Sequence, residues 1–163
     1  MRCSVKDILI NDGDITEISG SIEYDTLENN GDIITFITPI EFSGEMKNDN
    51  GEILVTGEIE FDYKVNCHRC GEEFNSTIQF NVEEIFSTEP MDSKYLLKGE
   101  VIDLEDMIID NIHLNLPVKF LCNEECKGLC TVCGTNLNNG TCNCQKDETD
   151  LRLLVLTKLL KEQ

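Results

Sequence analysis

Cysteine is the residue type in this sequence with the clearest chemistry. The chain has nine cysteines, and eight of them fall at spacings typical of metal sites. A two-residue gap between cysteines lets both sulfurs converge on one ion, and four thiolates suit tetrahedral zinc. We therefore predict that eight thiols bind metal. They are Cys67, Cys70, Cys122, Cys126, Cys130, Cys133, Cys142 and Cys144.

The last four of these cysteines form one compact set. Cys130-x-x-Cys133 and Cys142-x-Cys144 are separated by a turn rich in glycine and asparagine. Glycine in such a turn allows the tight bends that point backbone amides at sulfur. We expect a structural zinc ion here. An iron site of rubredoxin type is one alternative, because tetrahedral sulfur also suits iron, and redox or disulfide chemistry is the other.

The remaining cysteines predict a second set. Two ligands alone do not hold zinc, so Cys122 and Cys126 need partners, and Cys67 and Cys70 are the obvious complement. This pairing would join a strand-rich first half to the segment after Pro117. In the alternative pairing, Cys122 or Cys126 joins the later cluster, and either Cys142 or Cys144 is not a ligand.

Two closed four-thiolate sites leave no coordination position for water, which is typical of structural rather than catalytic zinc. Cys3 is then spare, and His68 is an alternative ligand in place of one cysteine. We interpret His113 as a satisfied or exposed histidine, with metal binding or acid–base chemistry as the alternative. No Ser/His/Asp set, phosphate-cradling glycine loop or HExxH motif appears, so we do not expect an enzyme.

Alternating strands are predicted to position the first cysteines. Residues 53–65 alternate cleanly between apolar and polar side chains, and residues 74–86 repeat the pattern, which is typical of half-buried strands. Asn29-Asn30-Gly31-Asp32 and the turn at 47–51 are hairpin signals. The expected fold class is α+β: an antiparallel β meander or open barrel with one packing helix, a cysteine-rich zinc ribbon and a C-terminal helix.

The same pattern divides the chain into three expected parts. Residues 1–117 form the sheet domain, with a loop over 87–100 and a helix at about 103–115 that is capped by Asp103. Residues 118–146 form the zinc-binding module, and residues 147–163 form the C-terminal helix, whose leucines cover most of its circumference.

The formal net charge of −19 is the strongest compositional signal. Nucleic-acid wrapping needs a basic face, and none is readable, so we do not expect direct RNA binding. The acidity indicates either solubility alone or a basic protein partner. No secretory signal or membrane segment is readable. We therefore expect the cytoplasm, where thiols stay reduced and bind metal in preference to forming disulfides.

Residues 126–138 (CKGLCTVCGTNLN), followed by Cys142-Asn143-Cys144, resemble the YceD family, the large-subunit ribosomal RNA accumulation proteins of bacteria and plastids. The resemblance extends to Cys67-His68-Arg69-Cys70, to Ile102-Asp103-Leu104 before Leu116-Pro117, and to residues 151–153. Thr131 and Leu151 stand where the family pattern has proline. Branches that lack the 130–144 half keep the CxRC element with a Cys or His pair after the helix, which supports the two-site pairing.

The resemblance implies a role in accumulation of large-subunit ribosomal RNA and no known enzymatic activity. We accordingly expect a non-enzymatic accessory factor for ribosome biogenesis, a zinc-stapled acidic module that binds a ribosomal protein or processing factor. The alternative is a zinc-thiolate redox sensor or metal carrier, which the close spacing of the thiols in 130–144 indicates.

Overall fold

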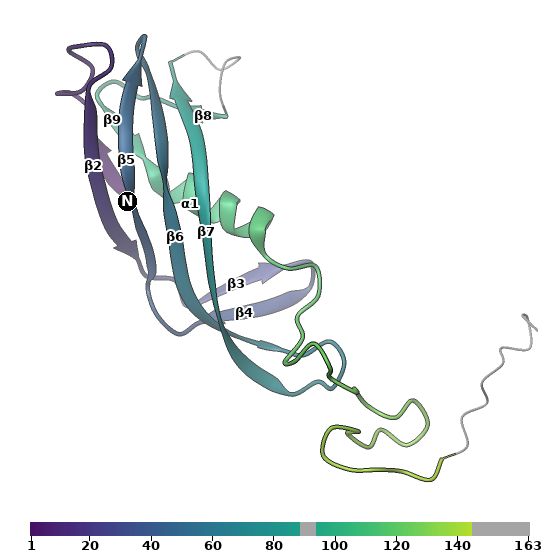
Figure 1. Ribbon diagram of the computed structural model, residues 1–163. Helices are drawn as coiled ribbons and strands as arrows, with labels where there is room; N and C mark the ends of the chain where they lie inside the picture. The colour runs from purple at the N-terminus through teal and green to yellow at the C-terminus, as the bar shows by residue number, and fades with distance from the viewer. Residues whose placement is uncertain (89–93, 145–163) are drawn as a thin grey trace, which may run out of the picture.

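The computed structural model describes residues 1–88 and 94–144. Its long strands form one curved sheet, a single helix crosses one side of that sheet, and a cysteine-rich tail leaves from its lower end (Figure 1). The elements are β1 (Arg2–Ser4), β2 (Ile15–Ile22), β3 (Thr26–Asn29), β4 (Asp32–Phe36), β5 (Ile40–Asp49), β6 (Glu52–Asn66), β7 (Glu73–Ser87), β8 (Tyr95–Leu96), β9 (Val101–Asp103) and α1 (Leu104–Asn115).

The sheet is built around β6. One edge of β6 pairs with β7 from Ile53 to Asn66. The other edge is shared, because β5 pairs with residues 52–60 and β4 pairs with Tyr63 and Lys64. These strands, with β2, β3 and β8, make a seven-stranded sheet, while β1 and β9 form a separate pair. The sheet is mostly antiparallel and stays open, which confirms the expected α+β class.

The predicted hairpin turns are confirmed. Asn30 and Gly31 join β3 to β4, and Asn50 and Gly51 join β5 to β6; all four residues have positive φ angles between 53° and 91°. Positive φ at both central residues is the conformation that two-residue hairpin turns require, and Asn-Gly adopts it at low cost.

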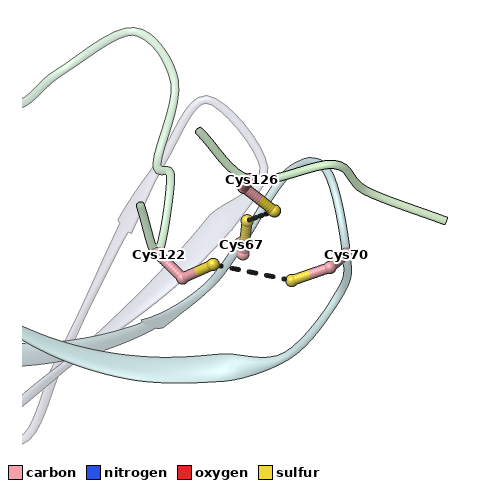
Figure 2. A group of neighbouring side chains, drawn as sticks. All are labelled: Cys67, Cys70, Cys122 and Cys126. Atoms are coloured by element: carbon pink, nitrogen blue, oxygen red, sulfur yellow. Dashed lines mark hydrogen bonds between the residues drawn. The ribbon is translucent and has the colours of Figure 1, made fainter. Parts of the chain in front are cut away.

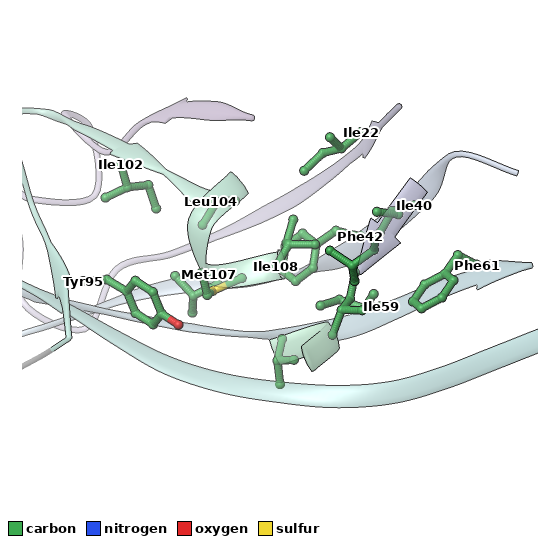
Figure 3. Packing of buried hydrophobic residues seen from close by; sticks show 14 of the residues in the cluster. Ile22, Ile40, Phe42, Ile59, Phe61, Tyr95, Ile102, Leu104, Met107 and Ile108 are labelled. Atoms are coloured by element: carbon green, nitrogen blue, oxygen red, sulfur yellow. The ribbon is translucent and has the colours of Figure 1, made fainter. Parts of the chain in front are cut away.

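The helix α1 begins at the predicted cap. The Asp103 carboxylate accepts a hydrogen bond from the Glu105 N–H, which satisfies one of the otherwise unpaired amides of the first turn. Leu104, Met107 and Ile108 are fully buried against the sheet, beside Phe42 and Ile59 among others (Figure 3). Burying one such side chain contributes about 1.5–3 kcal/mol, so this apolar stripe holds the helix in place.

The expected loop over 87–100 is only partly a loop. Tyr95 and Leu96 form β8, which runs parallel to the end of β7, and the Leu97 N–H donates to the Ser87 carbonyl at 2.9 Å. Residues 89–93 and the expected C-terminal helix at 147–163 lie outside the described residues. No helix in the described part of the chain is long and apolar enough to cross a membrane. The three-part division of the chain stays a prediction.

Candidate metal centres

The first group of thiols lies where the β6–β7 hairpin meets the segment after α1. We call Cys67, Cys70, Cys122 and Cys126 the hairpin-tip set (Figure 2). The Sγ atoms of Cys67 and Cys126 are 3.8 Å apart, those of Cys70 and Cys122 are 3.7 Å apart, and all four lie within 4.8 Å of one another. The hairpin tip and the later segment therefore bring four free thiols close together.

Backbone hydrogen bonds place these thiols. At the tip, the Cys67 N–H donates to the Glu72 carbonyl and the Gly71 N–H donates to the Cys67 carbonyl. Gly71 has φ +71°, a conformation that favours glycine. The His68 N–H donates to the Phe120 carbonyl at 2.9 Å. This bond brings the chain that leads to Cys122 alongside the tip.

The hairpin-tip set fits a tetrahedral metal ion. Zinc–sulfur bonds of about 2.3 Å place the sulfurs of a regular tetrahedron about 3.8 Å apart, close to the Sγ–Sγ separations of 3.8 Å (Cys67–Cys126) and 3.7 Å (Cys70–Cys122). N–H donors also reach the sulfurs: the Arg69 backbone donates to Cys67 Sγ at 3.4 Å, and Asn138 Nδ2 donates to Cys126 Sγ at 3.3 Å. Such outer contacts orient metal ligands.

The second group lies in the tail. We call Cys130, Cys133, Cys142 and Cys144 the ribbon set, and their Sγ atoms also lie within 4.8 Å of one another. A local loop holds the first two, because the Cys130 N–H donates to the Thr135 carbonyl and the Gly134 N–H donates to the Cys130 carbonyl. Cys130 is buried, Cys133 is exposed and the last two are intermediate. This set is also chemically suited to a metal, but it is more open to water.

Arg69 ties the two sets together. Its carbonyl accepts from the Leu129 N–H at 3.0 Å, and its guanidinium donates to the carbonyls of Glu124 and Cys126. Gly128 passes so close that a Cβ on it would lie 2.9 Å from the Arg69 carbonyl oxygen, and its φ is +72°. Arg69, one of the two residues between the tip cysteines, therefore organises the whole 124–129 segment.

The two sets share an electrostatic pattern. Burial works to raise the pKa of Cys67, but backbone N–H groups around its sulfur lower it to about 6. Hydrogen bonds from the Thr135 hydroxyl and backbone lower the pKa of Cys133 to about 6. Desolvation and neighbouring thiols raise the pKa of Cys122 to about 12, and the Cys133 sulfur foremost raises the pKa of Cys144 to about 12. A metal ion would remove this repulsion between thiolates.

The structure brings the cysteines together in the two-site pairing and places neither Cys122 nor Cys126 in the ribbon set. That either set binds metal, and that the metal is zinc, stays a prediction. His68 is in neither group, because its Nε2 lies 2.9 Å from Asp32 Oδ1. His113 Nδ1 lies 3.2 Å from Asn29 Oδ1, and Cys3 is a half-buried free thiol.

Sequence reasoning missed the residues that surround the sulfurs. Arg69 and Asn138 contact the hairpin-tip set, and Thr135 contacts Cys133 Sγ at 3.1 Å. Arg69 was within reach of a sequence argument, because it sits between two ligands. Asn138 was not, because its contact with Cys126 depends on how the loop folds back.

The fold and these sites define a class: α+β proteins with an open sheet whose hairpin tip meets a cysteine-rich tail. The family model described as "Large ribosomal RNA subunit accumulation protein YceD" matches residues 55–160. The chain therefore belongs to the YceD family, as the resemblance implied. No solved structure matches the chain significantly.

Among curated proteins, the chain is 24% identical over 147 residues to "Large ribosomal RNA subunit accumulation protein YCED homolog 1, chloroplastic" of Arabidopsis thaliana, covering 69% of this chain and 46% of that protein. It is 28% identical over 114 residues to an uncharacterized protein of Mycobacterium leprae, covering 64% and 52%. It is 33% identical over 93 residues to an uncharacterized protein of Mycobacterium tuberculosis, covering 52% and 45%. The chain thus spans about half the length of the curated relatives it matches.

Proposed function

We propose that this chain is a non-enzymatic accessory factor that supports accumulation of large-subunit ribosomal RNA by binding a basic protein. The observation that carries the proposal is membership of the YceD family, together with the name of the Arabidopsis relative. The basic partner is a ribosomal protein or a processing factor. Zinc in the two cysteine sets supplies cross-links that hold the binding surface in shape.

The outward face of the sheet supports a basic partner. Across β2 and β5, Glu17 lies directly opposite Glu45, and across β5 and β6, Glu41 lies directly opposite Glu60. Like charges directly opposite each other destabilise a sheet, so a cationic partner would relieve a cost that the free protein carries. A hollow of about 940 Å³ on this face is lined by four glutamates: Glu17, Glu45, Glu58 and Glu83.

The same charges disfavour direct wrapping of RNA. Three adjacent rows of side chains on this face contain neither lysine nor arginine, and the row beyond Glu17 has one lysine, Lys47. A surface that neutralises phosphates needs such residues. The rows are Glu17, Glu45, Thr56, Glu83; Ser19, Ser43, Glu58, Asn81; and Ser21, Glu41, Glu60, Gln79.

The four-thiolate sets support a structural role for the metal. With four sulfurs around one ion, all positions of a tetrahedral site are filled by protein, and catalytic zinc keeps one open. The hairpin-tip residues then fix the 122–126 segment against the sheet. In this proposal the protein contributes a binding surface of defined shape and negative charge, and no catalytic group.

Depletion of the protein in its own cells tests the role. We expect the amount of large-subunit ribosomal RNA to fall relative to small-subunit RNA, and a wild-type copy to restore it. A Glu45→Lys copy is expected to restore it poorly. A Glu28→Lys copy makes the same charge change on the β3–β4 hairpin and is expected to restore it fully. An unchanged ratio of the two RNAs after depletion contradicts the proposal.

Affinity capture tests the partner. Capture with and without ribonuclease is expected to recover the same basic ribosome-related protein, because the contact is between proteins. Loss of all ribosome-related proteins after ribonuclease treatment would show instead that RNA bridges the contact.

The exposure of the ribbon set favours a second candidate function, a zinc-thiolate redox sensor. Cys133 is exposed and its pKa is lowered to about 6, and an accessible thiolate is the form that oxidants attack. This candidate predicts that mild hydroperoxide treatment releases zinc far faster than from ordinary structural sites. Retention of zinc under that treatment contradicts this candidate function.

A further inference from the structure

One edge of β7 is open along most of its length. On one side, β7 pairs with β6 without interruption from Glu73 to Phe86. On the other side it pairs with β8, and only at Phe86 and Ser87. Within residues 1–88 and 94–144, no strand adjoins this second edge between Glu73 and Ile85. Figure 1 shows the same edge on the outside of the sheet.

The backbone groups at this edge can be assigned. The Cys67 N–H donates to the Glu72 carbonyl, and bonding alternates along an antiparallel pair. The even-numbered residues of β7 therefore bond to β6, and the odd-numbered ones point their N–H and C=O groups at the open edge. The Ser87 carbonyl fits this assignment, because it accepts the Leu97 N–H on the β8 side. Asn75, Thr77, Gln79 and Asn81 thus offer unused donors and acceptors there.

The open edge lacks the usual protection against strand addition. Proteins blunt exposed edges with charged side chains, especially lysine, with proline or with a bulge. Within its paired length β7 has no lysine, proline or bulge, and its glutamates, Glu73, Glu83 and Glu84, lie outside the middle of the strand. Residues 74–82 (FNSTIQFNV) contain no charged side chain. An extended segment that adds as a further strand would find a continuous template, which is a recurring mode of peptide recognition.

Charges beside the edge specify the added strand. The side chains of the edge-pointing residues lie on the outward face, where β6 places carboxylates directly opposite three of them: Asp62 opposite Thr77, Glu60 opposite Gln79 and Glu58 opposite Asn81. Glu83, on β7 itself, adds a further carboxylate beside the edge. Glu73 is partly neutralised, because Lys64 Nζ lies 3.2 Å from it. The outward-facing positions of an added strand therefore favour lysine or arginine.

A second copy of the chain is a poor occupant. An antiparallel pairing of two β7 strands centred on Ile78 would place Glu73 of each copy opposite Glu83 of the other. Each copy also carries a net charge of −19, so charge repulsion opposes self-pairing.

We propose that the open edge of β7 binds an extended protein segment with lysine or arginine at alternating positions, as an added strand. This inference deepens the proposed function, because it names the surface and the chemical class of the partner. It fails separately from that function, because binding to the edge is measured on the purified protein without reference to ribosomal RNA.

A model peptide tests the edge. The probe is a decapeptide of alternating lysine and valine, and its matched control has the same composition with all lysines first. Asn81→Pro removes an edge-pointing N–H without removing a bond to β6, which an edge strand tolerates. Ser19→Pro makes the same change on the open edge of β2, in the same cross-strand row. We expect Asn81→Pro to weaken binding of the alternating peptide roughly tenfold or more, and Ser19→Pro to leave it unchanged.

Amide hydrogen exchange locates the contact. In the free protein the amides of Asn75, Thr77, Gln79 and Asn81 are expected to exchange fast, and the alternating peptide is expected to protect them. Equal loss of binding in both proline variants, or equal binding of the control peptide, overturns the proposal in favour of plain charge attraction. Slow exchange of these amides in the free protein also overturns it, because the edge is then filled by the chain itself or by a second copy.

Discussion

The hairpin-tip set and the ribbon set have the same ligands but differ in what they connect. In the first, Cys67 and Cys70 belong to the sheet and their partners lie more than 50 residues later. In the second, all four cysteines come from one short stretch of the tail. Three sulfurs of the first set are buried, against one of the second. A metal ion bound by the first set would cross-link distant parts of the chain, and one bound by the second set would close a local loop.

This difference has an energetic meaning. A cross-link that closes a long loop removes more entropy from the unfolded chain than one that closes a short loop, so it stabilises the folded state more. A buried ion also exchanges with solvent less readily. We therefore expect the hairpin-tip set to control the stability of the sheet domain, and the ribbon set to control only the order of the tail. The following predictions test this contrast, from the largest expected effect to the smallest.

Removing one ligand from each set gives the largest effect. Cys70→Ser and Cys133→Ser are each expected to reduce the bound zinc from two ions to one, measured on protein purified without chelator. Structural zinc contributes on the order of 10 kcal/mol in zinc-finger peptides, and 1 kcal/mol shifts Tm by about 2–4 °C at this size. We expect Tm to fall by at least roughly 10 °C for Cys70→Ser and by only about a few degrees for Cys133→Ser. Equal losses of Tm would remove the contrast.

The pH dependence of metal binding is expected to be similar in both sets. Each has one thiol whose pKa is lowered to about 6 and one whose pKa is raised to about 12. At neutral pH the metal must displace the protons of the thiols whose pKa values are raised, which are Cys70 and Cys122 in the hairpin-tip set and Cys142 and Cys144 in the ribbon set. Zinc affinity therefore rises with pH. Below about pH 6 the thiol whose pKa is lowered also takes up a proton, and affinity falls more steeply.

Chelator competition at pH 5.5, 6.5 and 7.5 measures this dependence. The Cys133→Ser variant reports the hairpin-tip set, and Cys70→Ser reports the ribbon set. Affinity that does not change over this range in either variant would contradict the prediction. If zinc affinity changes with pH more steeply in one variant than in the other, the two sets differ in protonation as well as in burial.

Asn138 gives a smaller and more selective effect. It lies in the ribbon loop, but its side chain contacts Cys126 Sγ at 3.3 Å and accepts from the Lys127 N–H at 2.8 Å. Because outer contacts to metal ligands are worth about 10–100-fold in affinity, Asn138→Ala is expected to weaken the hairpin-tip site about tenfold and to leave the ribbon site unchanged. Asn139→Ala is the matched control, since Asn139 donates to Glu72 and to no sulfur.

Gly128→Ala gives the smallest effect. The added Cβ would meet the Arg69 carbonyl, and φ is +72° there, so we expect a loss of about 1–2 kcal/mol in the free energy of unfolding. Denaturant unfolding measures it. Gly140→Ala is the control, because a Cβ there has only ordinary contacts, at 3.9 Å. Equal losses in the free energy of unfolding for the two variants would mean that the chain at Gly128 has room for a Cβ beside the Arg69 carbonyl.

Local patterns explain what the sequence predicted well. The alternation over 53–65, the two Asn-Gly turns and the Asp103 cap each depend on neighbours within a few residues, and each appears in the structure. Counting ligands favoured the observed grouping of the cysteines and left a second pairing open, and the family resemblance supported the first.

Long-range features escaped prediction. The two-residue strand β8 has no periodicity to detect, and its parallel pairing with β7 depends on the path of the chain between them. The sharing of one β6 edge by β4 and β5 depends on where the sheet bends. The hairpin-tip cysteines Cys67, Cys70 and Cys126 are buried with Phe74 and Leu121 packed against them, a contact that spacing does not encode.

The length of β6 sets a scale for recognition. Its 15 residues, at about 3.3 Å each, give a contour length of roughly 45–50 Å, and the strand is curved (Figure 1). The glutamate row at Glu60 lies only about 23 Å along the strand from Cys67. A compact domain of about 100 residues has a radius of gyration of about 13 Å, so one such domain is wide enough to contact both the glutamate rows and the hairpin tip.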